Sequence, residues 1–209
     1  MRKTLIQLGA AFALGSVFVS PAAAQGYAGA VLSLSKVSDG CPLPEKCDDS
    51  GRGGKLYFGT RMAEPLLRLG AFKVAAMEVG LLRSSKARSQ GVELVDIVDE
   101  GELPFAVRNT IKADALTFAL VGSLPVADRL ALDVKAGAAY VSSTIRYEFD
   151  GRSDGSRTRN RLSPYAGLAL QYGVLSNVRV GAAVDVFRFN VAGESGVVSQ
   201  LGFGAEVDF

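Results

Sequence analysis

The chain has 209 residues, of which 48% are hydrophobic and 21% charged, and its formal net charge is +2. The apolar fraction is too high for a disordered chain, and the length suits one domain or two small ones. Histidine is absent, which excludes Ser-His-Asp and Cys-His catalysis and His-ligated zinc, and the 2 cysteines cannot make a four-thiolate metal site.

Residues 1–24 have the features of a secretory signal peptide. Arg2 and Lys3 give a positive start, residues 5–19 form a short apolar stretch, and three alanines at 22–24 form a cleavage site. A retained membrane helix is the alternative, but the apolar stretch is short for a bilayer and lacks a stop-transfer flank. Without the leader, residues 25–209 carry balanced charge, so nothing electrostatic favours nucleic acid as a partner.

Eight segments alternate apolar with small or polar residues at period two, which predicts β-strands. In chain order they are residues 29–35, 55–62, 72–82, 113–124, 130–140, 165–174, 178–187 and 199–209. The last segment separates the two faces completely, with Leu201 and Phe203 on one side and Gly202 and Gly204 on the other. No apolar run after residue 24 is long enough for a transmembrane helix.

The connections between these segments alternate in length. The short ones are residues 63–70, 125–129 and 175–177, and the long polar ones are residues 37–54, 84–112, 143–161 and 190–197. Short turns at one end and long loops at the other are typical of outer membrane barrels, whose turns are periplasmic and whose loops are extracellular. Residues 92–98 have strand periodicity, which allows the second long loop to extend its hairpin above the membrane.

The composition of the two faces indicates which one meets lipid. A soluble barrel points its apolar face inward, whereas a membrane barrel reverses the two faces. The less apolar face here is mostly Gly, Ala, Ser and Thr with a few charges, which suits a narrow interior better than a water-exposed surface. We therefore predict an all-β, eight-stranded antiparallel up-and-down transmembrane barrel, with Leu168, Val184 and Phe203 facing lipid. A periplasmic barrel of lipocalin type is the less favoured alternative.

With these strands and connections, the sequence resembles the eight-stranded transmembrane domain of the OmpA-type outer membrane protein superfamily. The matching stretches are GYAGAVLSLSK, MEVGLL and SPYAGLALQYGVLSNVRVGAAVDVFRF, and the resemblance extends over residues 26–209. It implies an outer membrane location and a C-terminal insertion signal at Phe209 that the outer-membrane assembly machinery reads. We expect no peptidoglycan-binding domain of the kind that larger members carry, and the absence of Trp leaves Tyr and Phe to form any aromatic girdle.

Several polar side chains fall on the predicted inward face. They are Glu78, Asp133, Lys135, Gln171, Arg179, Asp185 and Glu206. Charges in so narrow an interior must pair or hold water, because an isolated buried charge is very costly. We expect Asp133 and Asp185 to be partners of Lys135 and Arg179.

The resemblance also implies a role for this polar interior. In the OmpA-type family an ion-pair network blocks a continuous channel, and Glu78 and Lys135 fall at matching strand positions. Gly181 and Leu120 depart from the pattern, since basic residues are expected there. Two interpretations stay open: a satisfied polar core that plugs the barrel, which we favour, and a salt-bridge gate in a small pore.

Two features lie in the long loops. Cys41 and Cys47 bracket a short ring in the first loop, and an exported protein reaches an oxidising compartment, so we predict a disulfide. It either staples the loop against proteolysis or forms a rigid knuckle for a partner. Residues 143–161 carry five arginines, which could meet lipopolysaccharide phosphates or a host surface ligand, with ordinary solvated charge as the simpler alternative.

These observations predict an integral outer membrane protein with a structural and surface-interaction role in the cell envelope. The alternative is a narrow, porin-like passive pore for small solutes or ions. We expect a monomer whose partners are membrane lipid and lipopolysaccharide, with no cofactor and no metal. We do not expect an enzyme, because no candidate base lies beside a nucleophile or substrate.

Overall fold

The computed structural model describes residues 25–38, 46–97, 101–149 and 152–209. Eight long strands make up most of these residues: β1 (Gln25–Ser38), β3 (Ser50–Arg61), β5 (Phe72–Ile97), β6 (Gly101–Ala127), β7 (Leu130–Phe149), β8 (Arg152–Gly173), β9 (Val178–Val191) and β10 (Glu194–Asp208). Two short strands, β2 (Lys46–Asp48) and β4 (Leu67–Leu69), pair with β5. Within the described ranges, no helix is long and apolar enough to cross a membrane.

The eight long strands form a closed antiparallel ring. Chain neighbours pair in order from β3 to β10, and β1 joins both β3 and β10, so each of the eight has a strand on either side. The backbones of Gly26 and Phe209 exchange two hydrogen bonds of 3.1 and 2.9 Å where the two ends meet. Along the part of the barrel that all eight long strands span, no strand lies at a free edge of the sheet. The predicted eight-stranded up-and-down barrel is confirmed.

The orientation of the two faces also agrees with the sequence prediction. Leu168 is 50% exposed, Val184 37% and Phe203 74%, so these side chains lie on the outer surface. Their neighbours along the same strands, such as Ala169 and Asp185, are buried in the interior. A large apolar outer surface around a closed sheet is the arrangement that a lipid environment favours. The soluble lipocalin-type alternative is therefore wrong.

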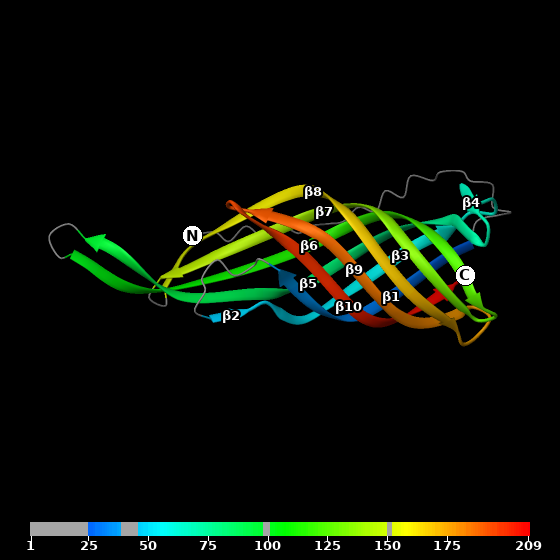
Figure 1. The fold of residues 1–209 in the computed structure, drawn as a ribbon, viewed down its shortest axis with the longest axis horizontal. Helices are drawn as coiled ribbons and strands as arrows, with labels where there is room; N and C mark the ends of the chain where they lie inside the picture. The colour runs from blue at the N-terminus through cyan, green and yellow to red at the C-terminus, as the bar shows by residue number, and fades with distance from the viewer. Residues whose placement is uncertain (1–24, 39–45, 98–100, 150–151) are drawn as a thin grey trace, which may run out of the picture.

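The two ends of the barrel differ strongly (Figure 1). At one end β6 and β7 meet at a tight turn, and β8 and β9 are joined by residues 174–177. At the other end the green β5–β6 hairpin projects well beyond the other strands, with β7 and β8 beside it over part of its length. By the rule for outer membrane barrels, the short turns are periplasmic and the long hairpins extracellular.

Where the structure describes them, the long polar connections are mostly strand rather than loop, which corrects the sequence prediction except for the expected extension of the hairpin within residues 84–112. Residues 84–97, 101–112 and 143–149 continue β5, β6 and β7, because apolar residues such as Ile111 and Ile145 keep the inward alternation going. Residues 190–197 are a tight hairpin around Ala192 and Gly193, whose φ angles of 51° and 89° suit a two-residue turn. The predicted leader, residues 1–24, lies outside the described residues.

Candidate functional site in the barrel interior

A group of charged residues lies on the inward face of the membrane-spanning strands. Lys55 of β3 places its Nζ 2.8 Å from Glu78 Oε1 and 3.0 Å from Asp185 Oδ1, and donates a 2.8 Å hydrogen bond to the Tyr165 hydroxyl. Lys135 Nζ lies 2.6 Å from the other Glu78 oxygen. These five residues, the central cluster, come from five different strands. Their formal charges cancel, which is what burial of four ions requires.

Two tyrosines pack beside the central cluster. Tyr57 lies opposite Gly29 and Tyr27 opposite Gly59, so each ring covers a glycine on the neighbouring strand. A Cβ at Gly29 would lie 2.2 Å from Tyr57 Cζ, so only glycine leaves room for that ring. The Tyr57 ring also faces Lys135 Nζ at 4.6 Å, a distance at which a ring attracts a cation. The Tyr57 ring therefore helps to solvate Lys55 and Lys135 in place of water, while the Tyr27 ring faces Arg61.

A second group of charges fills the turn end of the interior. Arg61 pairs with Glu206 at 2.5 Å and with Asp208, while Arg179 pairs with Asp208 at 2.8 Å and Glu206 at 3.5 Å. Gln171 donates to Glu206 at 3.2 Å and accepts from Arg179 at 3.3 Å. These five residues form the periplasmic cluster. Each carboxylate meets two guanidinium groups, so removal of one cation leaves a partner for each acid.

A cavity of about 260 Å³ lies between the two clusters and the periplasmic turns. Arg61, Glu78, Asp133 and Arg179 are among the residues that line it. Asp133 accepts a 2.5 Å hydrogen bond from Ser123 rather than forming the expected ion pair with Lys135. The polar lining gives the periplasmic side of the interior space for water, and Glu78 lies at its inner boundary.

Above the central cluster the interior is mostly apolar, with uncharged polar side chains such as Ser89, Asn109 and Ser143 buried among the apolar ones. The buried side chains that fill it, which we call the apolar plug, are Val37, Leu82, Ile111, Val141, Ile145, Phe187, Phe189, Val191 and Val198. Each is at most 3% exposed, and together they come from six of the eight strands of the ring. From the sequence, residues 84–112 and 143–161 are predicted to be loops, so this packing is not predicted. Extended strands carry the plug beyond the apolar outer band, where the sheet surrounds an ordinary hydrophobic core.

The structure thus assembles the predicted polar residues differently from the sequence expectation. All seven lie on the inward face, but Asp185 pairs with Lys55 instead of Arg179. Sequence reasoning missed Lys55, Arg61 and Asp208. The signal was present in residues 55–62, where Lys55, Tyr57 and Arg61 share one parity and Leu56 and Phe58 the other, but the short segment was not divided into faces.

Two other predicted features have partial structural descriptions. The Phe209 side chain is 75% exposed at the periplasmic end of the outer surface, beside Gly26. Cys41 lies outside the described residues, so its pairing with Cys47 stays a prediction. Among the residues that the structure describes, no group of three or more acidic or cysteine side chains is arranged to hold a metal ion.

The closed ring, its apolar outer band and its ionic interior define an outer membrane β-barrel. The sequence matches the model of the OmpA-like transmembrane domain over residues 21–186. The chain belongs to this family, whose eight-stranded architecture it shares. Comparison with curated proteins found no match to this chain.

Comparison with solved structures found similar outer membrane proteins. The crystal structure of Ail, the attachment invasion locus protein of Yersinia pestis, in complex with the heparin analogue sucrose octasulfate, is 16% identical, with 90% of this chain and 99% of Ail covered and a TM-score of 0.52. Neisserial surface protein A is 13% identical, with 89% and 99% covered and a TM-score of 0.48. The outer membrane protease OmpT from Escherichia coli is 11% identical, with 91% and 98% covered and a TM-score of 0.46.

Proposed function

We propose that this protein is a non-conducting integral barrel with a structural role in the outer membrane, and that it presents its long hairpins to the cell exterior. The observation that carries the proposal is the succession of two different seals along one lumen. The central cluster closes the lumen with paired charges, and the apolar plug closes it again on the extracellular side.

Ion conduction needs a hydrated path from one end of the lumen to the other. The charged side chains of Lys55, Glu78 and Lys135 are at most 5% exposed, so their mutual contacts replace water. Beyond them, Phe187 and Ile111 are fully buried, and the buried polar side chains on this part of the inward face, such as Asn109 and Ser143, carry no charge that could replace an ion's water. An ion that passed the first seal would therefore lose its hydration at the second, at a very high free energy.

The alternative is a narrow passive pore gated by the central cluster. The 260 Å³ cavity that reaches Glu78 from the periplasmic side is the feature that favours it. In this view, disruption of the central cluster alone opens the path. The two proposals therefore differ in what a single interior substitution does to conductance.

Planar-bilayer recordings of the refolded protein separate the two functions. We expect background conductance for the wild-type protein, for Glu78→Ala, and for the double variant Phe187→Ala/Phe189→Ala, since each variant keeps one seal. The triple variant, which combines all three changes, should conduct. Folding of every variant is checked by the difference in electrophoretic mobility between heated and unheated samples. A large, ion-selective conductance in Glu78→Ala alone would refute the structural role and favour the gated pore.

We further propose that the protein is not an enzyme and acts as a monomer. The sequence has no histidine, and Glu78, Asp185, Glu206 and Asp208 are all engaged by lysine or arginine. These carboxylates already bind Lys or Arg, so they are not placed to exchange a proton with a substrate as a general acid or base. Because OmpT, one of the similar solved structures, is a protease, a peptide-cleavage assay with folded protein is the relevant test, and we expect no cleavage above that of buffer.

The surface part of the role concerns the hairpins. β8 carries Arg157, Arg159 and Arg161 as exposed side chains beyond the membrane-spanning part. Ail was crystallised with a sulfated sugar, which makes a sulfated or phosphated surface ligand a reasonable probe for this chain. Deletion of the β7–β8 extension should abolish binding to such a ligand while leaving the barrel folded.

A further inference from the structure

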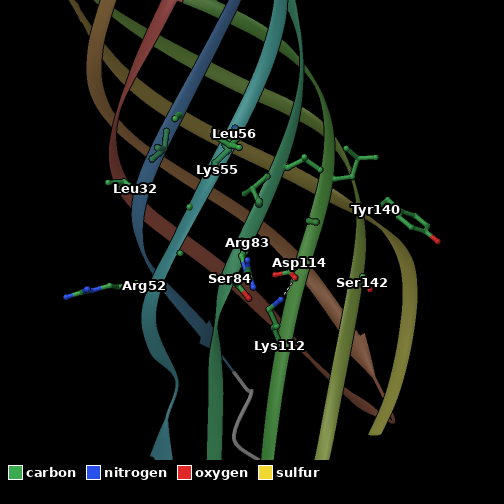
Figure 2. A pocket seen from close by; sticks show the side chains of 18 residues that line it. Leu32, Arg52, Lys55, Leu56, Arg83, Ser84, Lys112, Asp114, Tyr140 and Ser142 are labelled. Atoms are coloured by element: carbon green, nitrogen blue, oxygen red, sulfur yellow. Dashed lines mark hydrogen bonds and ion pairs between the residues drawn. The ribbon is translucent and has the colours of Figure 1, made fainter. Parts of the chain in front are cut away.

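Two hollows of the barrel differ in character. One is a groove of about 980 Å³ on the outer wall, across β1, β3, β5, β6 and β7 (Figure 2). Leu32 and Tyr140 line it and are 83% and 47% exposed, and Figure 2 shows Tyr140 pointing away from the barrel. The other hollow is the 260 Å³ cavity inside the lumen, which we call the periplasmic cavity. Because its lining is charged and faces away from lipid, it is the one suited to a polar solute.

A β-bulge makes room for the periplasmic cavity. The β5–β6 register shifts between Val74 and Ala76, so β5 carries one extra residue at this level. Such a bulge bends its strand. The cavity wall here consists of the small side chains of Ala71, Ala75 and Ala76, which leave the space unfilled. Ala71 and Lys73 are exposed, so the cavity is reached from the periplasmic end of the barrel.

Most charged groups that line the cavity already have a partner of opposite sign. Four of them belong to the central or the periplasmic cluster and form ion pairs there: Arg61, Glu78, Arg179 and Glu206. The other two are Asp133 and Lys73. Asp133 is 6% exposed and accepts a hydrogen bond from Ser123, but it forms no ion pair within the part of the chain that the structure describes. Lys73 likewise has no ion pair among the described residues.

These two charges lie on either side of one serine. Lys73 of β5 is directly opposite Ser123 of β6, which is directly opposite Asp133 of β7. Adjacent strands lie about 4.8 Å apart, so the two backbones are separated by about 10 Å. Both side chains line the periplasmic cavity, which keeps them apart. A buried carboxylate without an adjacent cation is costly, so Asp133 favours a ligand that brings a positive charge.

We propose that the periplasmic cavity binds a small zwitterion, such as an amino acid, with its ammonium group at Asp133 and its carboxylate at Lys73. This ligand supplies the cation that Asp133 lacks and the anion that Lys73 lacks, and it adds no net charge to the lumen. A simple cation or anion satisfies only one of the two. Drug-sized ligands occupy pockets of about 300–1,000 Å³, so a cavity of about 260 Å³ suits a smaller molecule.

The inference rests on the membrane orientation in the proposed function, and it adds a solute-binding site on the periplasmic side of both seals. The binding test is a titration of isotopically labelled, refolded barrel in neutral detergent micelles, followed through the NMR chemical shifts of its backbone amides. The zwitterionic probes are glycine, β-alanine and 4-aminobutanoate, whose two charges are increasingly far apart. Butylamine and butanoate have the size of 4-aminobutanoate but carry one charge each.

Two variants remove one charge each from the site, Asp133→Asn and Lys73→Gln. The matched controls, Asp128→Asn and Arg129→Gln, make equivalent changes at exposed residues of the β6–β7 turn, at the same end of the barrel. None of the four changes touches an ion pair of the central or periplasmic cluster, so we expect all four proteins to fold.

In wild-type protein, at least one zwitterion should bind about tenfold or more tightly than butylamine and butanoate, because hydrogen bonds to charged groups are the strong ones. The shift changes should centre on the amides of Lys73, Ser123 and Asp133. Lys73→Gln should lose the preference over butylamine, and Asp133→Asn the preference over butanoate, whereas both controls should keep them. A mere loss of stability would not change these two preferences separately.

Three results would overturn the proposal. They are the absence of any zwitterion-dependent shift at these amides, which leaves water as the occupant, equal binding of butylamine and the zwitterions, and equal changes in the variants and their controls. Background conductance and heat-shifted mobility, measured on the same samples, keep failure of this site distinct from failure of the structural role.

Discussion

The central cluster and the apolar plug are two layers of one lumen that are buried to a similar degree but held by different forces. In the central cluster, Glu78 binds two lysines from two other strands, and each contact needs a partner of opposite charge at a fixed distance. In the plug, Phe187 and Ile145 contact neighbours whose only requirement is shape and volume. The comparison teaches that a barrel interior can hold charged side chains where neighbouring strands supply counterions. Where the strands do not supply them, apolar side chains fill the interior.

The largest effect should follow removal of the shared carboxylate. Glu78→Ala leaves Lys135 without its ion-pair partner and Lys55 with Asp185 alone. We expect a loss of about 3–5 kcal/mol in the free energy of unfolding, because breaking a buried pair strands an uncompensated charge. Urea unfolding in lipid vesicles measures this change.

The exposed Glu64 provides the matched control, since Glu64→Ala removes a carboxylate outside the lumen and should change little. The double variant Glu78→Gln/Lys135→Met removes one charge of each sign and keeps the Lys55–Asp185 pair. It should be more stable than the sum of its single variants by about 1–3 kcal/mol. Strict additivity would mean that the central cluster is not a coupled unit.

Substitutions in the apolar plug should reduce the free energy of unfolding less when they preserve side-chain volume than when they do not. Phe187→Ala creates a cavity in a fully buried site, and we expect a loss of about 3–4 kcal/mol in unfolding free energy. Phe187→Leu keeps most of the volume and should cost less than about 1.5 kcal/mol. If both variants lose the same stability in urea unfolding, the plug depends on something other than packing.

The tyrosine and glycine pairs beside the central cluster provide a third test. Gly29→Ala places a Cβ 2.2 Å from Tyr57 Cζ, so the ring that faces Lys135 must move. We expect a loss of about 1–3 kcal/mol from overpacking. Gly155→Ala, with no atom within 4 Å of its Cβ, is the control and should be nearly neutral. Similar unfolding midpoints for the two variants would contradict the steric argument.

The smallest effect on the free energy of unfolding should come from a substitution in a solvent-exposed ion pair. Lys36 and Asp49 lie 3.7 Å apart with side chains 61% and 31% exposed. Lys36→Gln should change the free energy of unfolding by less than about 0.5 kcal/mol, because solvent and salt screen exposed pairs. A loss comparable to that of Glu78→Ala would show that burial is not what distinguishes the two pairs.

The sequence by itself determined the number of strands, their faces and the antiparallel order. Period-two alternation reports which side chains share a face, and it does so without knowledge of any neighbour, as Leu168 and Ala169 show. The same alternation placed Glu78, Lys135 and Asp185 in the interior. It also continues through residues 84–112 and 143–161, but their polar outward residues suggested loops, because these strands rise above the membrane and meet water rather than lipid.

Only the tertiary structure decided which interior groups meet. Lys55 and Asp185 are 130 positions apart in the chain, and their 3.0 Å contact depends on ring closure and on the stagger between strands, neither of which alternation encodes. The same stagger placed Phe187 and Ile111 in one layer and opposed Lys86 to Lys112 on the outer wall. Faces are local properties of a strand, whereas partners across a lumen are properties of the closed barrel.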